Sequence, residues 1–406
     1  MKALLVLIYH VLILFCFLFE FRLIGFITTR RMSIIIAFVT LFFRRKELIN
    51  LLRSIDRKRL EQSAMMMVAC MILVSITSLA ITIRDSNSVY LEPYYFINLF
   101  LYIYLFSFYC AIEFKTYEKF AASYLVCFLI QFIAVIYSVI NTDVRMFFYD
   151  NFYSGEDYIA ANIENGSRIF GIALHSSGGS IICSTCAVVL VYLTIQNKLS
   201  AWKFYMPYAF LMILTVFIAR TGVLVELCLL IYYLITRDAK SFVKNSFLIA
   251  GFAFFVIYVI LQILSSIDPA VEEYFKEWMT AAFNSEGRNK TIEGINRQIP
   301  DFSSSYILGT SVFVGHVPNG DYVQSDSGYI MNYIAMGIIG SLVYYLGMIK
   351  LYNIPRISIY QKPVRRFFYL LILLSFIMEY KEPFMFKYVF PFIIPVITQY
   401  CQYFEA

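Results

Sequence analysis

Residues 177–196 read SGGSIICSTCAVVLVYLTIQ and contain no charged side chain. A helix needs roughly 20 predominantly apolar residues to cross the hydrocarbon core of a bilayer, so this stretch predicts a membrane-spanning helix. The whole chain has the same character: of its 406 residues, 60% are hydrophobic, 18% aromatic and 15% charged, and the mean hydropathy is +0.71. We therefore expect an all-α, multi-pass transmembrane helical bundle.

Apolar runs of similar length predict about 12 spans, which would form a single integral membrane domain over residues 1–406. The second is the weakest, because Thr28, Thr29, Arg30 and Arg31 interrupt it and a charge at a span centre costs roughly 2.5–3.5 kcal/mol on insertion scales. Its start can be re-entrant or shifted. The expected spans lie near residues 3–19, 23–43, 65–83, 94–112, 120–140, 177–196, 204–220, 222–236, 246–264, 328–349, 367–378 and 384–402.

Positive side chains gather in short connections, chiefly residues 44–59 and 350–366. Short loops rich in lysine and arginine stay in the cytoplasm, so both loops and both termini are expected there. Residues 141–176, the turn at 220–222 and residues 265–327 then face the opposite side, which is the periplasm if the membrane is a bacterial inner membrane. The formal charge of +6 is thereby explained by orientation signals, and a nucleic-acid partner is not expected.

The first apolar run, from Lys2 to Phe19, has no small-residue cleavage site after it, so we expect a retained span. All eight cysteines fall in apolar runs, so no disulfide framework is implied. Cys183 and Cys186 have C-x-x-C spacing inside a span. We interpret them as small packing residues, with a redox or metal role as the alternative.

One long polar loop, residues 265–327, separates the ninth and tenth expected spans. Asp268 can cap a helix that begins with Pro269, and apolar residues follow on one face with helical spacing. They are Val271, Tyr274, Phe275, Trp278, Met279, Ala282 and Phe283. This amphipathic helix is expected either at the membrane interface or packed against the bundle.

Three arginines on the expected outer side could bind an anion. Arg168 lies in a glycine-bounded segment that ends at Gly171, Arg220 lies in the turn Ala219–Gly222, and Arg288 follows Gly287. Guanidinium groups bind phosphate oxygens through paired hydrogen bonds, which favours a lipid diphosphate as ligand. For Arg220 the alternative is a buried structural pair with Glu226.

Two of the three histidines, His175 and His316, and the carboxylate Asp326 also fall on the outer side. Either imidazole could remove a proton from a sugar hydroxyl, because histidine titrates near neutral pH. Asp326 could orient or deprotonate an acceptor, or simply cap the tenth span. No metalloprotease, P-loop or serine-hydrolase motif is present, so those classes lack support, and no metal or cofactor is expected.

Several short motifs occur in a fixed order. Arg168 precedes Gly171 as Arg-x-x-Gly, Arg-Thr-Gly follows at 220–222, and Gly-Arg at 287–288 opens the long loop. Ile-Leu-Gly-Thr at 307–310, Asp-Ser-Gly-Tyr at 326–329 and Met-Gly-Ile-Ile-Gly at 336–340 come later. In order and sidedness this layout resembles the bacterial O-antigen polymerase family, the Wzy-type enzymes, and more distantly the O-antigen ligases.

The resemblance implies an enzyme that joins oligosaccharide repeat units carried on undecaprenyl diphosphate, without nucleotide sugar or an essential metal. Arg168, Arg220 and Arg288 would hold the donor diphosphate as leaving group. Ligases of this type often carry a histidine at the start of the span after the long loop, where this chain has Asp326. The base therefore stays open among His316, Asp326 and His175. A chain-length regulator protein is a further candidate partner, and a lipid-linked oligosaccharide flippase or a ligase is the alternative function.

Overall fold

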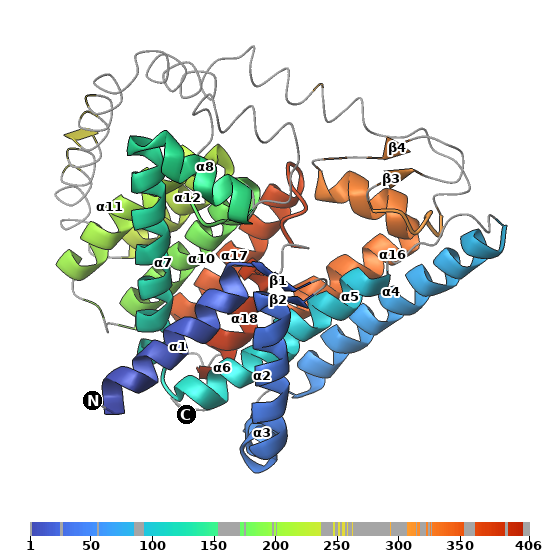
Figure 1. The fold of residues 1–406 in the computed structure, drawn as a ribbon. Coiled ribbons are helices and arrows are strands. Elements are labelled where there is room, and N and C mark those ends of the chain that lie inside the picture. Colours follow the sequence, from blue (N-terminus) through green and yellow to red (C-terminus); the bar gives the residue numbers. More distant parts are fainter. Residues whose placement is uncertain are drawn as a thin grey trace. The chain divides into compact units, whose positions relative to one another are not determined.

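The computed structural model is built of helices, with two short antiparallel strand pairs (Figure 1). By contact it divides into unit 1, Met1–Ile36 with Thr116–Arg288, and unit 2, Ala37–Lys115 with Asn289–Ala406. The residues that the structure describes are 2–24, 27–54, 57–84, 93–152, 171–173, 176–196, 199, 201–236, 247, 251, 254–255, 258, 262, 293, 307–313, 315–316, 322–323, 325, 327–352, 362–385 and 389–400.

Within these residues, five helices are long and apolar enough to cross a membrane. They are Lys58–Ala80, Tyr95–Phe114, Tyr117–Ile140, Gly178–Ile195 and Gly328–Tyr352, and shorter apolar helices accompany them. These helices indicate a membrane protein, as the composition predicts. The expected span near 246–264 lies almost entirely outside the described residues, and so does the expected amphipathic helix at 268–283. The count of about 12 spans stays a prediction.

Unit 1 is organised around one buried helix. Its elements are α1 (Lys2–Leu18), β1 (Arg22–Ile24), β2 (Ile27–Thr28), the start of α2 (Thr29–Phe43), α7 (Tyr117–Ile140), α8 (Thr142–Phe152), α10 (Ser176–Ile195), α11 (Ala201–Ile218) and α12 (Arg220–Thr236). Helix α10 packs against α7, α11 and α12, and 89% of its apolar window is buried. It is therefore the core of this unit. Cys183 and Cys186 are fully buried in it as free thiols, which agrees with a packing role.

The polar interruption at residues 28–31 is a helix start rather than the middle of a span. Residues 22–24 and 27–28 form the β1–β2 pair, and α2 begins at Thr29. The Arg30 guanidinium donates to the carbonyls of Phe17 (2.7 Å) and Leu18 (3.2 Å) and pairs with Glu20. The last carbonyls of a helix lack partners inside that helix, and a cation there is favourable. Arg30 thus caps α1, which explains why a buried arginine is tolerated.

Unit 2 contains α3 (Arg45–Ser54), α4 (Arg57–Arg84), α5 (Pro93–Phe100), the π-helical turn η1 (Leu101–Leu105), α6 (Phe106–Phe114), β3 (Gly315–His316), β4 (Tyr322–Val323), α16 (Gly328–Tyr352), α17 (Lys362–Glu379) and α18 (Val389–Gln399). The closest packing is between α4 and α16 (Figure 1). Ser63 donates to the Gly347 carbonyl (2.9 Å) and Cys70 to the Gly340 carbonyl (3.5 Å). The two helices therefore run antiparallel.

Three contacts bring the basic ends of unit 2 together. The antiparallel pairing places the start of α4 beside the end of α16, where Lys350 lies. Arg44 forms an ion pair with Glu113 at the end of α6 (2.9 Å), and the Ser63 hydroxyl lies 2.6 Å from that of Tyr104. Arg44 and the start of α4 thus lie at the same end of unit 2 as the C-termini of α6 and α16. That this end faces the cytoplasm stays a prediction.

Candidate functional site

In unit 1, the Arg-x-x-Gly motif ends on a glycine that no other residue could replace without strain. Gly171 has a φ of 58°, and an added Cβ would lie 2.7 Å from Val135 Cγ2 on α7. The next residue, Ile172, donates its N–H to Gln131 Oε1 (2.9 Å). These contacts hold the end of the motif against the last turns of α7. Arg168 and His175 themselves lie outside the described residues.

The Arg-Thr-Gly motif is the first helical turn of α12 rather than the expected loop turn, and only Ala219 separates it from the end of α11. A Cβ on Gly222 would lie 3.0 Å from both the Cβ and the carbonyl oxygen of Ser180, and a Cβ on Gly179 would lie 2.9 Å from Ile218 Cγ2. The turn and the start of α10 are therefore in close contact. The structure brings together two segments that the sequence analysis placed on one side, although the Arg220 side chain is outside its description.

The proposed alternative partner of Arg220 is engaged elsewhere. Glu226 is completely buried on α12, and its Oε1 lies 2.6 Å from the Thr215 hydroxyl of α11. Positions 220 and 226 are separated by about 9 Å along a helix axis. No basic side chain within the described part of the chain contacts Glu226, and because the Arg220 side chain is not described, the structural Arg220–Glu226 pair stays an alternative.

One arginine in the segment expected outside was missed by the sequence analysis. Arg145 on α8 is 8% exposed, and its Nε donates to the Ser138 carbonyl in the last turn of α7 (2.9 Å). Burial lowers the pKa of this guanidinium, yet arginine stays charged because its pKa starts so high. Arg145 thus stabilises the C-terminus of α7, and this contact assigns it a structural role.

In unit 2, the expected tenth span is sharply bent. Gly337 has φ 65° and ψ −173°, which divides α16 after Met336. Asn332 Nδ2 and the Tyr345 hydroxyl are 2.8 Å apart although the residues are 13 positions apart. Thirteen residues of straight helix would cover about 20 Å, so the two segments must fold toward each other.

The backbone groups freed by this bend are satisfied by the end of the long loop. Thr310 N donates to Ile334 O (2.8 Å), Ser311 N to Ala335 O (2.8 Å), and Ile339 N to Ile307 O (3.4 Å). We call residues 307–311 and 334–339 together the loop–helix clasp. It joins the Ile-Leu-Gly-Thr motif to the Met-Gly-Ile-Ile-Gly motif. Unpaired backbone groups are costly in a membrane, which gives the clasp a physical reason.

Two glycines permit this close backbone approach. Gly309 has a φ of 86°, and a Cβ there would lie 2.5 Å from Gly337 N; a Cβ on Gly337 would lie 2.5 Å from Gly309 N. The segment is also anchored sideways, because the Ser311 hydroxyl donates to the Val74 carbonyl (2.9 Å) and contacts Thr77 Oγ1. Residues 311–313 are buried, so this part of the long polar loop belongs to the packed interior of unit 2.

The Asp-Ser-Gly-Tyr motif leads into α16 directly above a buried carboxylate that the sequence analysis did not single out. Glu379, the last residue of α17, accepts hydrogen bonds from Asn332 Nδ2 (3.2 Å), the Tyr345 hydroxyl (3.4 Å) and Met385 N (2.8 Å). A side chain at Gly328 would collide with its Oε1. The carboxylate thus sits at the N-terminus of α16, where a negative charge is favourable.

The remaining candidate bases are only partly placed. His316 lies in β3, opposite Tyr322 of β4, and its side chain is not described. Asp326 lies outside the described residues, but its neighbours Ser325 and Ser327 are buried, and Ser327 N donates to Ser325 Oγ (3.1 Å). Gly328, which follows Ser327, is the residue of this segment whose added Cβ would meet the Glu379 carboxylate.

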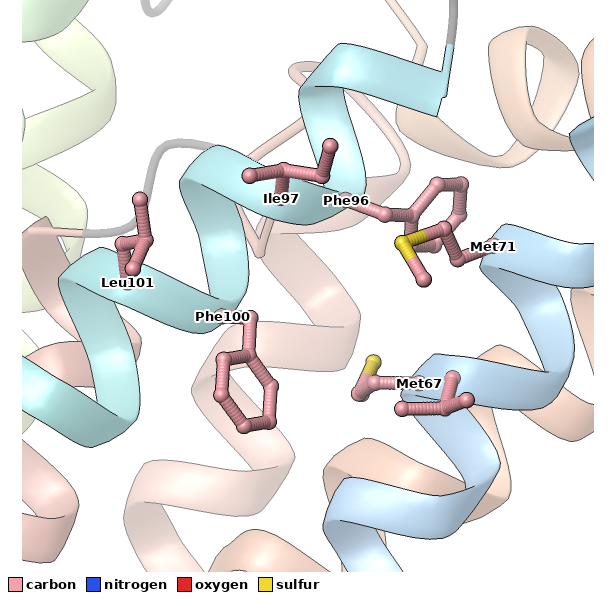
Figure 2. A pocket seen from close by; sticks show the side chains of 7 residues that line it. Met67, Met71, Phe96, Ile97, Phe100 and Leu101 are labelled. Carbon is pink, nitrogen blue, oxygen red and sulfur yellow. The ribbon is translucent and has the colours of Figure 1, made fainter.

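A cavity of 220 Å³ lies between α4 and the α5–η1 segment. Figure 2 shows Met67 and Met71 of α4 opposite Phe96 and Phe100 of α5. The lining is completed by Val68, Ile97 and Leu101. Because every lining side chain is apolar, the cavity suits a hydrocarbon group and offers nothing to hold a sugar or a phosphate.

Among the described residues, no three histidine, cysteine, aspartate or glutamate side chains form a group that could hold a metal ion. Comparisons with protein-family models, curated proteins and solved structures found no match.

Proposed function

We propose that the chain is an O-antigen, or surface polysaccharide, polymerase of the bacterial inner membrane. It joins undecaprenyl-diphosphate-linked oligosaccharide repeat units at the periplasmic face. One observation carries the proposal: the glycines of the motifs that resemble this family lie at contacts too close for any side chain. Gly222 contacts Ser180 in unit 1, and Gly309 contacts Gly337 in unit 2. In unit 2 the second of these contacts joins two of the motifs, Ile-Leu-Gly-Thr and Met-Gly-Ile-Ile-Gly, which are far apart in the sequence.

In the proposed reaction, Arg168, Arg220 and Arg288 bind the diphosphate of the donor. The bond between the anomeric carbon and the diphosphate oxygen breaks, and the lipid diphosphate leaves with the electron pair. The acceptor hydroxyl oxygen bonds to that carbon and gives its proton to a base, for which His316, Asp326 and His175 are the candidates. Guanidinium groups stabilise the departing charge, so no metal is needed for this step.

A lipid-linked oligosaccharide flippase is the second candidate, because bent helices and buried carboxyls are features of transporters. The bend at Gly337 and the buried Glu226 favour it. At this bend, however, the freed backbone groups bond to residues 307–311. They are thus occupied rather than presented to a substrate, and we rank the polymerase first.

The test is complementation of a deletion strain with Arg168→Ala, Arg220→Ala and Arg288→Ala. Each variant should abolish long polysaccharide chains while single repeat units still reach the cell surface. Lys290→Ala and Arg297→Ala are matched controls, since they remove cations that lie close to Arg288 in the sequence and have no role in the proposed reaction. Normal chain length in all three arginine variants would refute the mechanism.

The same strains separate the two functions. A polymerase defect leaves lipid-linked repeat units on the outer face of the membrane, whereas a flippase defect leaves them on the cytoplasmic face. Accessibility of these units to an impermeant oxidising label in intact spheroplasts measures the difference. Labelling that requires membrane lysis would favour the flippase, and complete loss of capped core with polymer still made would favour a ligase.

A further inference from the structure

Unit 1 contains a buried carboxyl group that the proposed reaction does not use. Glu226 on α12 is completely shielded, and its Oε2 has no hydrogen-bond partner among the described residues. Helix α12 packs against α10 and α11. A buried carboxylate without a positive partner is among the most costly groups in a protein, and such a group usually becomes neutral instead.

The hydrogen bonds around Thr215 determine which form of the carboxyl fits. The Thr215 hydroxyl lies 2.9 Å from the Leu211 carbonyl and 2.6 Å from Glu226 Oε1. A hydroxyl has one proton to donate. If Glu226 were ionised, both neighbours would be acceptors, and one of the two short contacts would lack a proton.

A proton on Glu226 Oε1 satisfies both contacts. The carboxylic acid then donates to Thr215 Oγ1, and Thr215 donates to the Leu211 carbonyl. The 2.6 Å separation is at the short end of the range for O–H···O bonds. The chain of donors then runs in one direction from Glu226 to Leu211, and the cost of a buried charge disappears.

We propose that Glu226 is a proton-binding site inside the helical bundle of unit 1, occupied at neutral pH, with Thr215 as its acceptor. The ionisable groups that face it are two thiols and a phenol, namely Cys183 and Cys186 on α10 and Tyr208 on α11. The Tyr208 hydroxyl donates to the backbone carbonyl oxygen of Glu226 (2.6 Å) and not to its carboxyl group. None of these provides a positive charge. The site is independent of the proposed polymerase reaction.

The other buried carboxyl shows the contrast. Glu379 receives hydrogen bonds from an amide, a hydroxyl and a backbone N–H, and lies at the start of α16. Several donors and a helix N-terminus stabilise an ionised carboxylate. The surroundings of Glu226 thus favour the neutral carboxylic acid, whereas those of Glu379 favour the ionised carboxylate.

Infrared difference spectroscopy of the full-length protein in lipid nanodiscs tests the proposal. Wild type minus Glu226→Gln at pH 7 should contain the C=O stretching band of a protonated carboxylic acid and no carboxylate bands. The control is Glu47→Gln, an exposed glutamate paired with Arg44, whose difference spectrum should contain carboxylate bands. Thr215→Val keeps Glu226 and removes its acceptor, so the acid band should remain and move to higher frequency.

Carboxylate bands in the Glu226→Gln difference spectrum would overturn the proposal. So would an acid band in wild type that stays unmoved in Thr215→Val, a reading that does not depend on the folding of the glutamine variant. Spectra recorded in sodium and in choline salts test whether the carboxyl group binds a metal cation instead of a proton. An acid band that sodium converts into carboxylate bands would identify a cation site instead.

Discussion

Replacing Gly337 by alanine should open or strain the loop–helix clasp. The residue has φ 65° and ψ −173°, a backbone region used almost only by glycine. The new Cβ would lie 2.5 Å from Gly309 N. That neighbour is backbone and cannot rotate away as a side chain can.

The expected cost follows from the two ways in which the chain could respond. If the clasp holds, the strained backbone costs of order 1–3 kcal/mol, and the overlap adds a similar amount. If the clasp opens, its three hydrogen bonds are lost, at about 0.5–1.5 kcal/mol each. The chain takes the less costly of the two responses, so we expect Gly337→Ala to destabilise unit 2 by roughly 2–4 kcal/mol.

Unfolding by sodium dodecyl sulfate from mixed micelles measures this change. Gly347→Ala on the same helix is the matched control, because Gly347 has no positive φ and its Cβ would meet the flexible end of Met67 at 3.0 Å and Met66 Cβ at 3.1 Å, with no backbone atom nearer than 3.7 Å. It should change stability by less than about 1 kcal/mol. Gly309→Ala should be equally damaging but not additive with Gly337→Ala, since both open one clasp. If Gly337→Ala is as stable as Gly347→Ala, α16 is not bent in this way.

Three further perturbations follow from contacts in the two units. Gly222→Ala should destabilise unit 1 by about 1–3 kcal/mol through overpacking, and a compensating Ser180→Gly should recover part of this in the same unfolding assay. Arg30→Met leaves Glu20 without its partner and should cost about 3–5 kcal/mol, with a smaller loss when Glu20→Gln is combined with it. The Arg44 guanidinium lowers the pKa of Glu47, so this exposed pair stabilises the fold by at most about 1 kcal/mol above the ordinary glutamate pKa. That contribution is lost as the pH falls through the lowered pKa, so the stabilities of wild type and Glu47→Gln should converge in acid and separate toward neutral pH.

Apolar length predicted the helices of the bundle well, because crossing a membrane imposes a direct requirement on sequence. The helices α7 and α10 lie close to the expected spans 120–140 and 177–196. The start of α2 could not be derived in the same way. Arg30 reads as an interruption of an apolar run, and only the position of the α1 carbonyls reveals that it is a cap.

The sequence predicted which motifs belong to the candidate site, but it did not predict which residues these motifs contact. Glycines in the Arg-Thr-Gly and Ile-Leu-Gly-Thr motifs suggested close approach, whereas their partners depend on tertiary packing. Glu379 was missed because it follows an expected span and looks like a boundary residue. The sequence feature that could have identified Glu379 is its position as a carboxylate directly after an apolar run. Ionisable residues in or beside a membrane span are rare and suggest a specific role.

The clasp also constrains how the protein is made. Residues 307–311 leave the ribosome before α16, yet they supply the hydrogen-bond partners that the bent part of α16 lacks. Hydrocarbon offers no substitute partners. We therefore expect the first turns of α16 to stay beside the preceding segment until both have been synthesised. On this reasoning, two successive pieces of nascent chain enter the membrane together.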